Sequence, residues 1–211
     1  MPRFFIFSCI KFNLFILSLL MIKKKKYLYF LIDKLDENNL DYAKKIGAIL
    51  VVRNPEKLKL ADLKKFKRKC SQNKIDLYIA NNIKILFKLN SNKFYISAYN
   101  KKQFWHLKYA NAQIDIIGSA HNPREIYEKI RQGCNQIFLS RLFKTDYKYK
   151  KGFLGKIKFN LLSRTFSGKY IALGGIKEKN FSHVKDLNVS GIAMSSDKKK
   201  AGTYVPAFFK K

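Results

Sequence analysis

The sequence predicts a compact, single-domain (β/α)8 barrel, the TIM-barrel class of α/β proteins. From Tyr27 onward, short β-branched or aromatic runs alternate with Lys-rich helical segments, a pattern typical of parallel strands joined by helices. Eight such runs recur roughly every twenty to thirty residues, and eight strand-helix units close a barrel. The 211 residues are 47% hydrophobic, with only 10 Gly and 4 Pro, so the chain also has enough apolar material for a full core.

The predicted strands must be joined by short connections, because about 185 residues are few for an eight-stranded α/β barrel. They span Tyr27–Asp33, Gly47–Arg53, Ile75–Ala80, Lys93–Ser97, Asp115–Ser119, Gln136–Ser140, Tyr170–Gly174 and Gly191–Ser195.

Two of the intervening segments carry clear helix signals. In the first, Asn122 is an N-cap residue, Pro123 fits the first helical position, Glu125 stands at the capping-box position and Gly133 ends the helix. In the second, an apolar face is flanked by lysines. That face consists of Leu60, Leu63, Phe66 and Cys70, and it predicts that Cys70 is a core residue.

The chain is strongly basic, with 44 Lys and Arg against 14 Asp and Glu and a formal net charge of +30. Such a field attracts nucleic acid, anionic membranes and phosphorylated small molecules alike. Of the basic residues 37 are Lys and 7 are Arg, and they are spread along the whole chain without a dominant stripe. Base-reading proteins rely on Arg, so we interpret the charge as surface composition of the kind that an AT-rich genome produces. No specific nucleic-acid partner is expected.

The cysteines and histidines indicate a reducing compartment and no zinc motif. Three widely spaced cysteines form neither a disulfide framework nor a CxxC site. The three histidines are too scattered for a helical zinc site. We expect a cytoplasmic protein.

Residues 1–22 differ in character from the barrel at 23–211. Phe4 to Met21 is mostly Phe, Ile and Leu, and Lys23 to Lys26 follow it. The positive charge lies on the wrong side for a secretory signal, and no small-residue cleavage site follows. Three interpretations stay open: an over-extended reading frame whose start is Met21, a helix covering one end of the barrel, or a membrane anchor that leaves the domain in the cytoplasm.

In barrels of this class, function lies at the carboxyl ends of the strands, and phosphate sites form after strands seven and eight. Gly174 and Gly175 lie at the carboxyl end of the seventh predicted strand, and Ser195 and Ser196 lie at that of the eighth. Backbone N–H groups at a Gly-Gly turn can approach an anion without a Cβ in the way. The sequence therefore predicts a phosphate site at these two strand ends.

At these residues the chain resembles the thiamine-phosphate synthase and thiazole tautomerase (TenI-like) family, from Tyr27 to about Ser196. The stretches that carry the resemblance are IIGSAH at 116–121, IFLSRLFKT at 137–145 with Gly155, IALGGI at 171–176 with Asn180, and GIAMSS at 191–196. The resemblance implies a phosphorylated thiazole or thiamine monophosphate bound at Gly175, Ser195 and Ser196. It also implies substrate contacts at Ser119, His121, Thr145 and Gly174.

The resemblance further implies a transferase of thiamine biosynthesis, which joins a hydroxymethylpyrimidine to the thiazole nitrogen as pyrophosphate leaves. Cations and Mg²⁺ hold such a leaving group. By position in the family's pattern, Arg53, Asn81 and Lys148 would carry the catalysis, with Thr145 beside them.

The chain departs from the family's pattern at the metal. The two acidic positions fall on Asn82 and Asn100, a strand-two Lys falls on Pro55, and a second loop Thr falls on Tyr147. A hard cation prefers anionic oxygen, so magnesium bound by Asn82 and Asn100 is expected to be weak, although the pyrophosphate could carry its own metal. The tautomerase branch's His corresponds to Arg141, which cannot shuttle a proton near neutral pH.

Three functions therefore stay open. The first is a divergent thiamine-phosphate synthase, the second a catalytically impaired or regulatory binder of thiamine phosphates, and the third an unrelated role of the basic surface such as nucleic-acid binding. The partners implied are phosphorylated thiazole and pyrimidine molecules. A homo-oligomer is compatible with the sequence, and membrane contact is expected only if residues 1–22 are an anchor.

Overall fold

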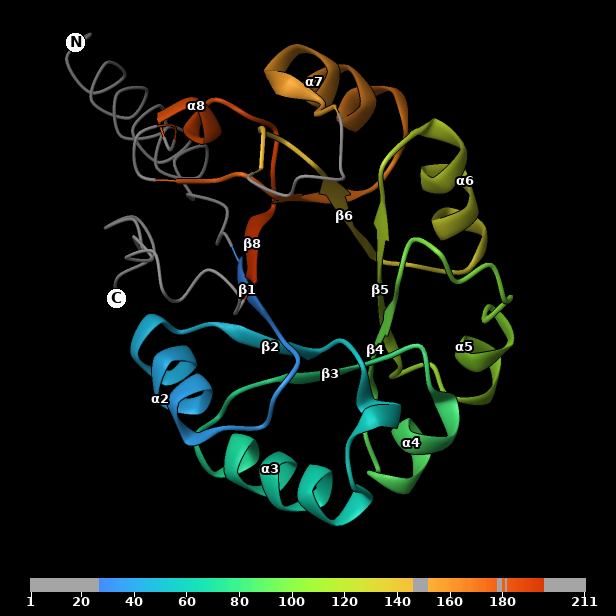
Figure 1. Cartoon of the computed structure of the whole chain (residues 1–211). Coiled ribbons are helices and arrows are strands. Elements are labelled where there is room, and N and C mark those ends of the chain that lie inside the picture. The colour runs from blue at the N-terminus through green and yellow to red at the C-terminus, as the bar shows by residue number, and fades with distance from the viewer. Residues whose placement is uncertain (1–26, 146–151, 178–179, 181, 196–211) are drawn as a thin grey trace, which may run out of the picture.

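The computed structural model describes residues 27–145, 152–177, 180 and 182–195. Eight parallel strands form a closed barrel in the order β1 to β8, and β1 pairs with β8 to complete the ring. Figure 1 shows the barrel with its helices arranged around the outside. The predicted (β/α)8 barrel is confirmed.

All eight strands fall where the sequence predicts them. They are β1 (Tyr27–Ile32), β2 (Ile49–Val52), β3 (Leu77–Ala80), β4 (Lys93–Ile96), β5 (Asp115–Ala120), β6 (Gln136–Ser140), β7 (Lys169–Leu173) and β8 (Gly191–Ser195). The helical elements are α2 (Glu37–Ile46), η1 (Pro55–Lys57), α3 (Leu60–Gln72), α4 (Ile83–Lys88), α5 (His106–Ala110), α6 (Pro123–Arg131), α7 (Gly155–Thr165) and α8 (Ser182–Lys185).

Several strand boundaries differ from the predicted ones, and one has a clear cause. The second strand begins at Ile49, because Gly47 caps the C-terminus of α2 with φ +64°, a left-handed conformation that glycine adopts at low cost. Asp33 and Arg53, predicted as the last residues of β1 and β2, lie just beyond the strands. They are therefore loop residues at the rim of the barrel.

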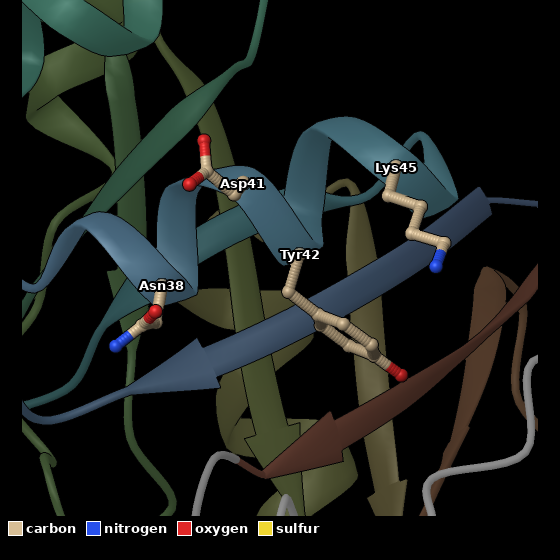
Figure 2. A pocket seen from close by; sticks show the side chains of 4 residues that line it. All are labelled: Asn38, Asp41, Tyr42 and Lys45. Carbon is tan, nitrogen blue, oxygen red and sulfur yellow. The ribbon is translucent and has the colours of Figure 1, made fainter.

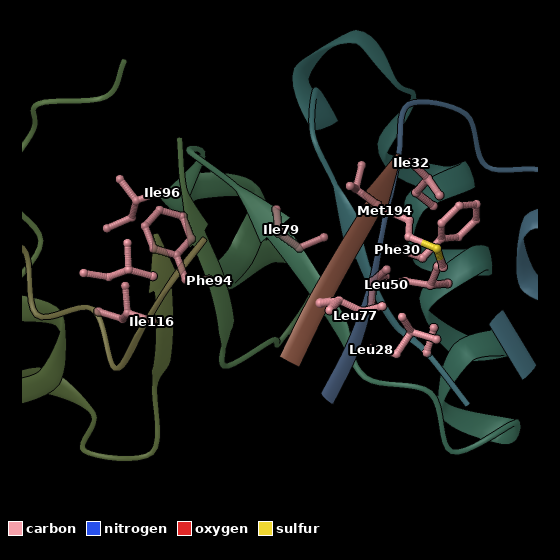
Figure 3. Packing of buried hydrophobic residues seen from close by; sticks show 14 of the residues in the cluster. Leu28, Phe30, Ile32, Leu50, Leu77, Ile79, Phe94, Ile96, Ile116 and Met194 are labelled. Atoms are coloured by element: carbon pink, nitrogen blue, oxygen red, sulfur yellow. The ribbon is translucent and has the colours of Figure 1, made fainter. Parts of the chain in front are cut away.

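The core has two layers, and alternation along each strand separates them. Leu28, Phe30 and Ile32 of β1 point outward and pack in a cluster between the strands and the helices, whereas Tyr29 and Leu31 point into the barrel. Figure 3 shows the outer cluster, in which the labelled side chains come from six strands. Because side chains pack on both faces of the sheet, each strand end is held in place along the barrel axis.

Aromatic rings fill the inside of the barrel. The Tyr29 ring lies 4.9 Å from Phe138 and 6.2 Å from Tyr78, between ring centroids. The Tyr78 hydroxyl donates to Asp115 Oδ2 at 2.5 Å, and Asp115 opens β5 at the amino-terminal end of the barrel. Burial opposes ionisation of Asp115, yet hydrogen bonds from Tyr78 and Asn135 outweigh it and lower the pKa of this carboxyl. The amino-terminal end of the barrel interior is thus packed by rings and closed by a hydrogen-bonded network.

Both helices singled out in the sequence form as expected. Asn122 caps α6, accepting from the Glu125 backbone N–H at 2.9 Å. On α3, Leu63, Phe66 and Cys70 are buried. Burial raises the pKa of the Cys70 thiol to about 12, so it stays protonated and serves as a core residue. Within the described ranges, no helix is long and apolar enough to cross a membrane.

Candidate functional site

The carboxyl ends of the strands form one end of the barrel, which we call the mouth. Strand ends and the loops that follow them bring polar side chains and a glycine turn to the mouth: Asp33, Arg53, Asn54, Asn81, Ser97, Asn100, Ser119, His121, Arg141, Thr145, Gly174, Gly175 and Ser195. The predicted site residues within the described ranges lie at this end, because parallel strands all end on the same side.

The guanidinium of Arg53 is paired with Asp33 across β1 and β2. Arg53 Nε donates to Asp33 Oδ1 at 3.0 Å, and Nη2 bonds Oδ2 of the same carboxylate. Asn54 Nδ2 also donates to Asp33 Oδ1, at 2.9 Å. The bidentate geometry holds Arg53 in place and offsets part of its charge. Asp33 was predicted as the last residue of the first strand, at the carboxyl end where function lies, but the sequence did not assign it a role.

Asn81 and Asn100 form a second pair, between the ends of β3 and β4. Asn100 Nδ2 donates to Asn81 Oδ1 at 3.2 Å, and the Ser97 backbone N–H donates to the same oxygen at 2.9 Å. Asn81 has φ +58°, a left-handed conformation in which Asn is more common than most residues. Asn100 Oδ1 accepts from the Lys102 N–H at 3.0 Å. Both side-chain oxygens are therefore used within the protein.

Asn82, the first predicted metal position, is the N-cap of α4. Its Oδ1 accepts from the Ile85 backbone N–H at 3.0 Å. A capping side chain satisfies one of the amide groups that the first helical turn leaves unpaired. The structure thus gives Asn82 a local structural role.

Tyr95 and Ser119 form the floor of the mouth. The Tyr95 hydroxyl donates to Ser119 Oγ at 3.0 Å, and both residues are buried. Burial raises the pKa of Tyr95, so its hydroxyl stays protonated. Tyr95 was not among the residues predicted for the site. The signal was its inward position between outward-facing Phe94 and Ile96 on a strand that ends at the mouth.

His121 is tied to the helix that follows it. Its backbone N–H donates to Glu125 Oε2 at 2.7 Å, and its Nδ1 lies 2.8 Å from the same oxygen. In the neutral ring this contact places the proton on Nδ1 and leaves Nε2 as the acceptor. His121, for which the resemblance implies a substrate contact, therefore also braces the start of α6.

The loop after β6 is closed at its base. The Leu154 N–H donates to the Arg141 carbonyl at 2.8 Å, and the Gly155 N–H donates to the Leu142 carbonyl at 2.9 Å. Thr145 lies in this loop, is only 9% exposed, and its hydroxyl has no hydrogen-bond partner among the described residues. Nearly all buried hydroxyls in proteins are paired, so this group needs a partner.

The loop after β6 packs against Gly174 and Gly175, which follow β7. A Cβ on Gly175 would lie 2.4 Å from the Phe143 carbonyl oxygen and 2.8 Å from that of Lys144. Gly174 and Gly175 have φ +94° and +71°, so both need glycine on conformational grounds too. Asn180 Nδ2 donates to the Gly175 carbonyl at 2.8 Å and steadies the turn. The turn and the Thr145 loop are thereby packed together.

The remaining predicted residues are partly outside the described chain. Ser195 ends β8 and is half-buried beside β1. Lys148, Tyr147 and Ser196 lie outside the described residues, as do residues 1–22. Arg141 lies against the turn, since a Cβ on Gly174 would be 3.1 Å from its Cγ.

The side chains at the two predicted metal positions do not fit a magnesium ion. The Asn82 and Asn100 oxygens already accept backbone hydrogen bonds. The nearby carboxylates of Asp33 and Glu125 are paired with Arg53 and His121. Among the described residues no group of three His, Cys, Asp or Glu side chains could hold a metal. Mg²⁺ requires near-octahedral oxygen ligands, preferably anionic, and this donor set does not supply them.

A hollow outside the mouth is lined by α2. Asn38, Asp41, Tyr42 and Lys45 surround it on the outer side of the barrel. Figure 2 shows these side chains along one helix, with the Tyr42 ring lying over the strands. Tyr42 packs 5.3 Å from the Phe30 ring, between centroids. The hollow belongs to the outer helix layer and contributes nothing to the mouth.

Comparison with known proteins gives the family. The family model for thiamine monophosphate synthase (TMP-TENI) matches residues 32–197. Thiamine-phosphate synthase from Prochlorococcus marinus subsp. pastoris is 34% identical over 82 residues, covering 38% of this chain and 23% of the relative. The matched segment thus spans about a quarter of the length of that curated relative.

Solved structures show the same fold. Thiamine phosphate pyrophosphorylase from Pyrococcus furiosus superposes with a TM-score of 0.63 at 15% identity, covering 82% of this chain and 87% of the other. N-(5'-phosphoribosyl)anthranilate isomerase from Pyrococcus furiosus gives 0.59 at 14%, covering 87% and 94%. Identities this low establish the barrel alone, whereas the family model covers most of the chain. The resemblance found in the sequence is confirmed, and the chain belongs to the thiamine monophosphate synthase (TMP-TENI) family.

Proposed function

We propose that the mouth binds phosphorylated small molecules and that the chain is a divergent thiamine-phosphate synthase, which couples hydroxymethylpyrimidine pyrophosphate to a thiazole phosphate. The observation that carries the binding part is the Thr145 hydroxyl, buried without a described partner in the loop packed on the Gly174–Gly175 turn. Family membership supports the reaction class.

A phosphate is the ligand that this arrangement suits. A buried hydroxyl without a hydrogen-bond partner costs about 1–3 kcal/mol. A phosphate oxygen that accepts a hydrogen bond from this hydroxyl removes that cost. The formal net charge of +30 favours the approach of an anion. A neutral ligand could accept the same hydrogen bond but would not gain from the electrostatic attraction.

In the proposed reaction the thiazole nitrogen forms a bond to the methylene carbon of the pyrimidine. The bond from that carbon to pyrophosphate breaks, and its electron pair leaves with the pyrophosphate. Groups that stabilise the departing negative charge accelerate such a step. We assign this task to Arg53 and Asn81, and to Lys148 from its place in the family's pattern. Asp33 holds the Arg53 guanidinium by two hydrogen bonds and offsets part of its charge.

Magnesium has no built site at Asn82 and Asn100, so we expect the protein alone to bind the ion weakly. We propose that any magnesium needed for turnover arrives with the pyrophosphate substrate. The surplus of lysines offsets part of the remaining charge.

A second candidate function is a binder of thiamine phosphates without turnover. The observation that favours it is the use of the Asn82 and Asn100 oxygens in hydrogen bonds within the protein. The two functions share one binding site and differ only in catalysis.

Two measurements on the full chain separate these functions. Calorimetry with thiamine monophosphate tests binding, and thiamine phosphate formation from both substrates across a magnesium series tests turnover. Binding with turnover supports the synthase, and binding without turnover supports the silent binder. Absence of binding at low ionic strength, where electrostatic attraction is strongest, would overturn both.

A further inference from the structure

A lysine buried on α6 reaches the loop that carries Asn100. Lys129 is fully buried, and its Nζ donates to the Asn100 carbonyl at 2.9 Å and to Gln132 Oε1 at 2.8 Å. Gln132, also fully buried, donates through Nε2 to the carbonyls of Asn100 at 2.9 Å and Lys102 at 2.8 Å. These two side chains form a closed set of hydrogen bonds, which we call the Lys129–Gln132 clamp.

The strand beside α6 leaves room for this lysine. A Cβ on Gly118 of β5 would lie 2.8 Å from Lys129 Cδ and 2.8 Å from Cys134 Sγ. Gly118 sits in ordinary extended backbone, so its need for glycine is steric rather than conformational. Any larger residue at this position would displace the Lys129 stem.

Burying an ammonium group is expensive unless acceptors replace the lost water. Here burial lowers the pKa of Lys129, and the described acceptors are neutral oxygens. A methionine would fill the same space without this cost. The charge therefore calls for an explanation beyond packing.

The clamp determines where Asn100 stands. It holds the backbone at Asn100 and Lys102, while the Asn100 side chain donates to Asn81 at the end of the neighbouring strand β3. Hydrogen bonds thus connect Lys129 and Gln132, on the outer helix layer, with the Asn100–Asn81 pair. The Lys102 N–H, which donates to Asn100 Oδ1, belongs to the same network.

We propose that Lys129 is a positioning residue: through the clamp it fixes the loop after β4 and holds Asn100 against Asn81 for binding of a pyrophosphate group. The part about the loop stands on the geometry alone, and the part about the ligand rests on the proposed function. Because the clamp uses only this chain's own groups, the order of the loop does not depend on a metal.

The loop is tested first, in the full chain, with Lys129→Met. Trp105 is the only tryptophan and is half exposed beside this loop, so its quenching by acrylamide reports on loop order. Hydrogen exchange at the Lys102 amide reports on the Asn100 bond. In Lys129→Met we expect stronger quenching of Trp105 and about tenfold faster exchange at the Lys102 amide. Both increases should be equally large with magnesium and with a chelator. Arg131→Met, which removes a charge from the exposed face of α6, is the matched control and should change neither.

Ligand binding is tested next, by calorimetry with inorganic pyrophosphate. Lys129→Met should weaken binding about tenfold, and this effect should disappear in an Asn100→Ala background because both changes act through one contact. A purely structural lysine would lower the melting temperature and leave affinity per folded molecule unchanged.

The outcomes separate the two parts. Unchanged loop exchange and quenching overturn the clamp. A loosened loop in a protein that binds no pyrophosphate leaves the clamp standing and overturns the ligand part together with the proposed function. Additive effects of Lys129→Met and Asn100→Ala on affinity overturn the positioning role alone. If Lys129→Met fails to fold, Gln132→Leu, which removes two donors to the loop, decides by the same measurements.

Discussion

The Asn100 side chain donates to Asn81 Oδ1 at 3.2 Å and joins the ends of β3 and β4 by an amide pair. At this spot the family's pattern has an acid in place of Asn100. An amide donor facing an oxygen makes a neutral hydrogen bond, whereas a carboxylate facing the same oxygen would make a place for a cation. If that acid is a metal ligand, as the resemblance implies, Asn100 replaces it with an internal hydrogen bond.

Restoring the acids should restore metal binding. In Asn82→Asp the helix cap is kept, since Asp caps as well as Asn. In Asn100→Asp two oxygens face each other and attract a cation. We predict that the double variant forms thiamine phosphate faster and needs less magnesium for half-maximal rate. A magnesium profile of both proteins measures this.

The control for the helix is Asn82→Ala, which loses the cap of α4 and should cost about 1 kcal/mol of stability. If the unmodified protein has the same rate and needs the same magnesium concentration as the double variant, Asn82 and Asn100 do not impair catalysis.

The turn at Gly175 should be intolerant of any side chain. The Cβ of Gly175→Ala would lie 2.4 Å from the Phe143 carbonyl oxygen, and φ is +71°. Backbone cannot move aside as a flexible side chain does, so we expect a loss of about 2 kcal/mol or more in the free energy of unfolding. Urea denaturation measures it.

Gly47→Ala is the matched control, because Gly47 has φ +64° but no atom within 4 Å of its Cβ position. It should cost only the conformational penalty, about 1 kcal/mol. Equal losses at Gly47 and Gly175 would mean that the loop after β6 is not packed on the turn.

The hydrogen bonds to Asp115 should make the free energy of unfolding depend on pH. Hydrogen bonds from Tyr78 and Asn135 and the charge of Lys93 outweigh burial and lower the pKa of Asp115 in the folded state. A lowered folded pKa adds stability above the unfolded pKa of about 3.9, and this is lost as pH falls through the folded value. We predict that Asp115→Asn is less stable at neutral pH and that its disadvantage shrinks in acid.

Urea unfolding of both proteins across a pH series checks this. Asp41→Asn, exposed on α2 beyond its first turn, is a suitable control and should follow the unmodified protein. A constant difference between Asp115→Asn and the unmodified protein at every pH would contradict the role of ionisation.

The fold followed from sequence because strand signals are local. Each strand is a short β-branched or aromatic run. The ends of α6 are indicated by Asn122 and Pro123 at its start and by Gly133 just after it. The start of β2 was harder to predict, because Gly47 can begin a strand or end a helix, and only the packed helix decides.

The site was less accessible, because its function depends on which partner each side chain finds. Asn82 and Asn100 look alike in sequence, yet one caps a helix and the other reaches across to Asn81. Lys129 looked like one surface lysine among many, and only the space beside Gly118 shows that it is buried. Tertiary contacts of this kind leave no local signal.

The most direct test of a phosphate site at the mouth is Thr145→Val, which keeps the shape of the side chain and removes the hydroxyl. Because that hydroxyl is buried without a described partner, we predict that the unligated variant is as stable as the unmodified protein or more stable by about 1 kcal/mol. Thr165→Val, at an exposed hydroxyl that donates to the Leu161 carbonyl, is the control.

The deciding measurement is calorimetric titration of thiamine monophosphate into Thr145→Val, Thr165→Val and the unmodified protein. If the phosphate accepts a hydrogen bond from the Thr145 hydroxyl, thiamine monophosphate should bind about tenfold more weakly to Thr145→Val. Its affinity for Thr165→Val should be unchanged. Equal affinity in all three proteins would contradict a phosphate site at Thr145 and with it the proposed function of the mouth.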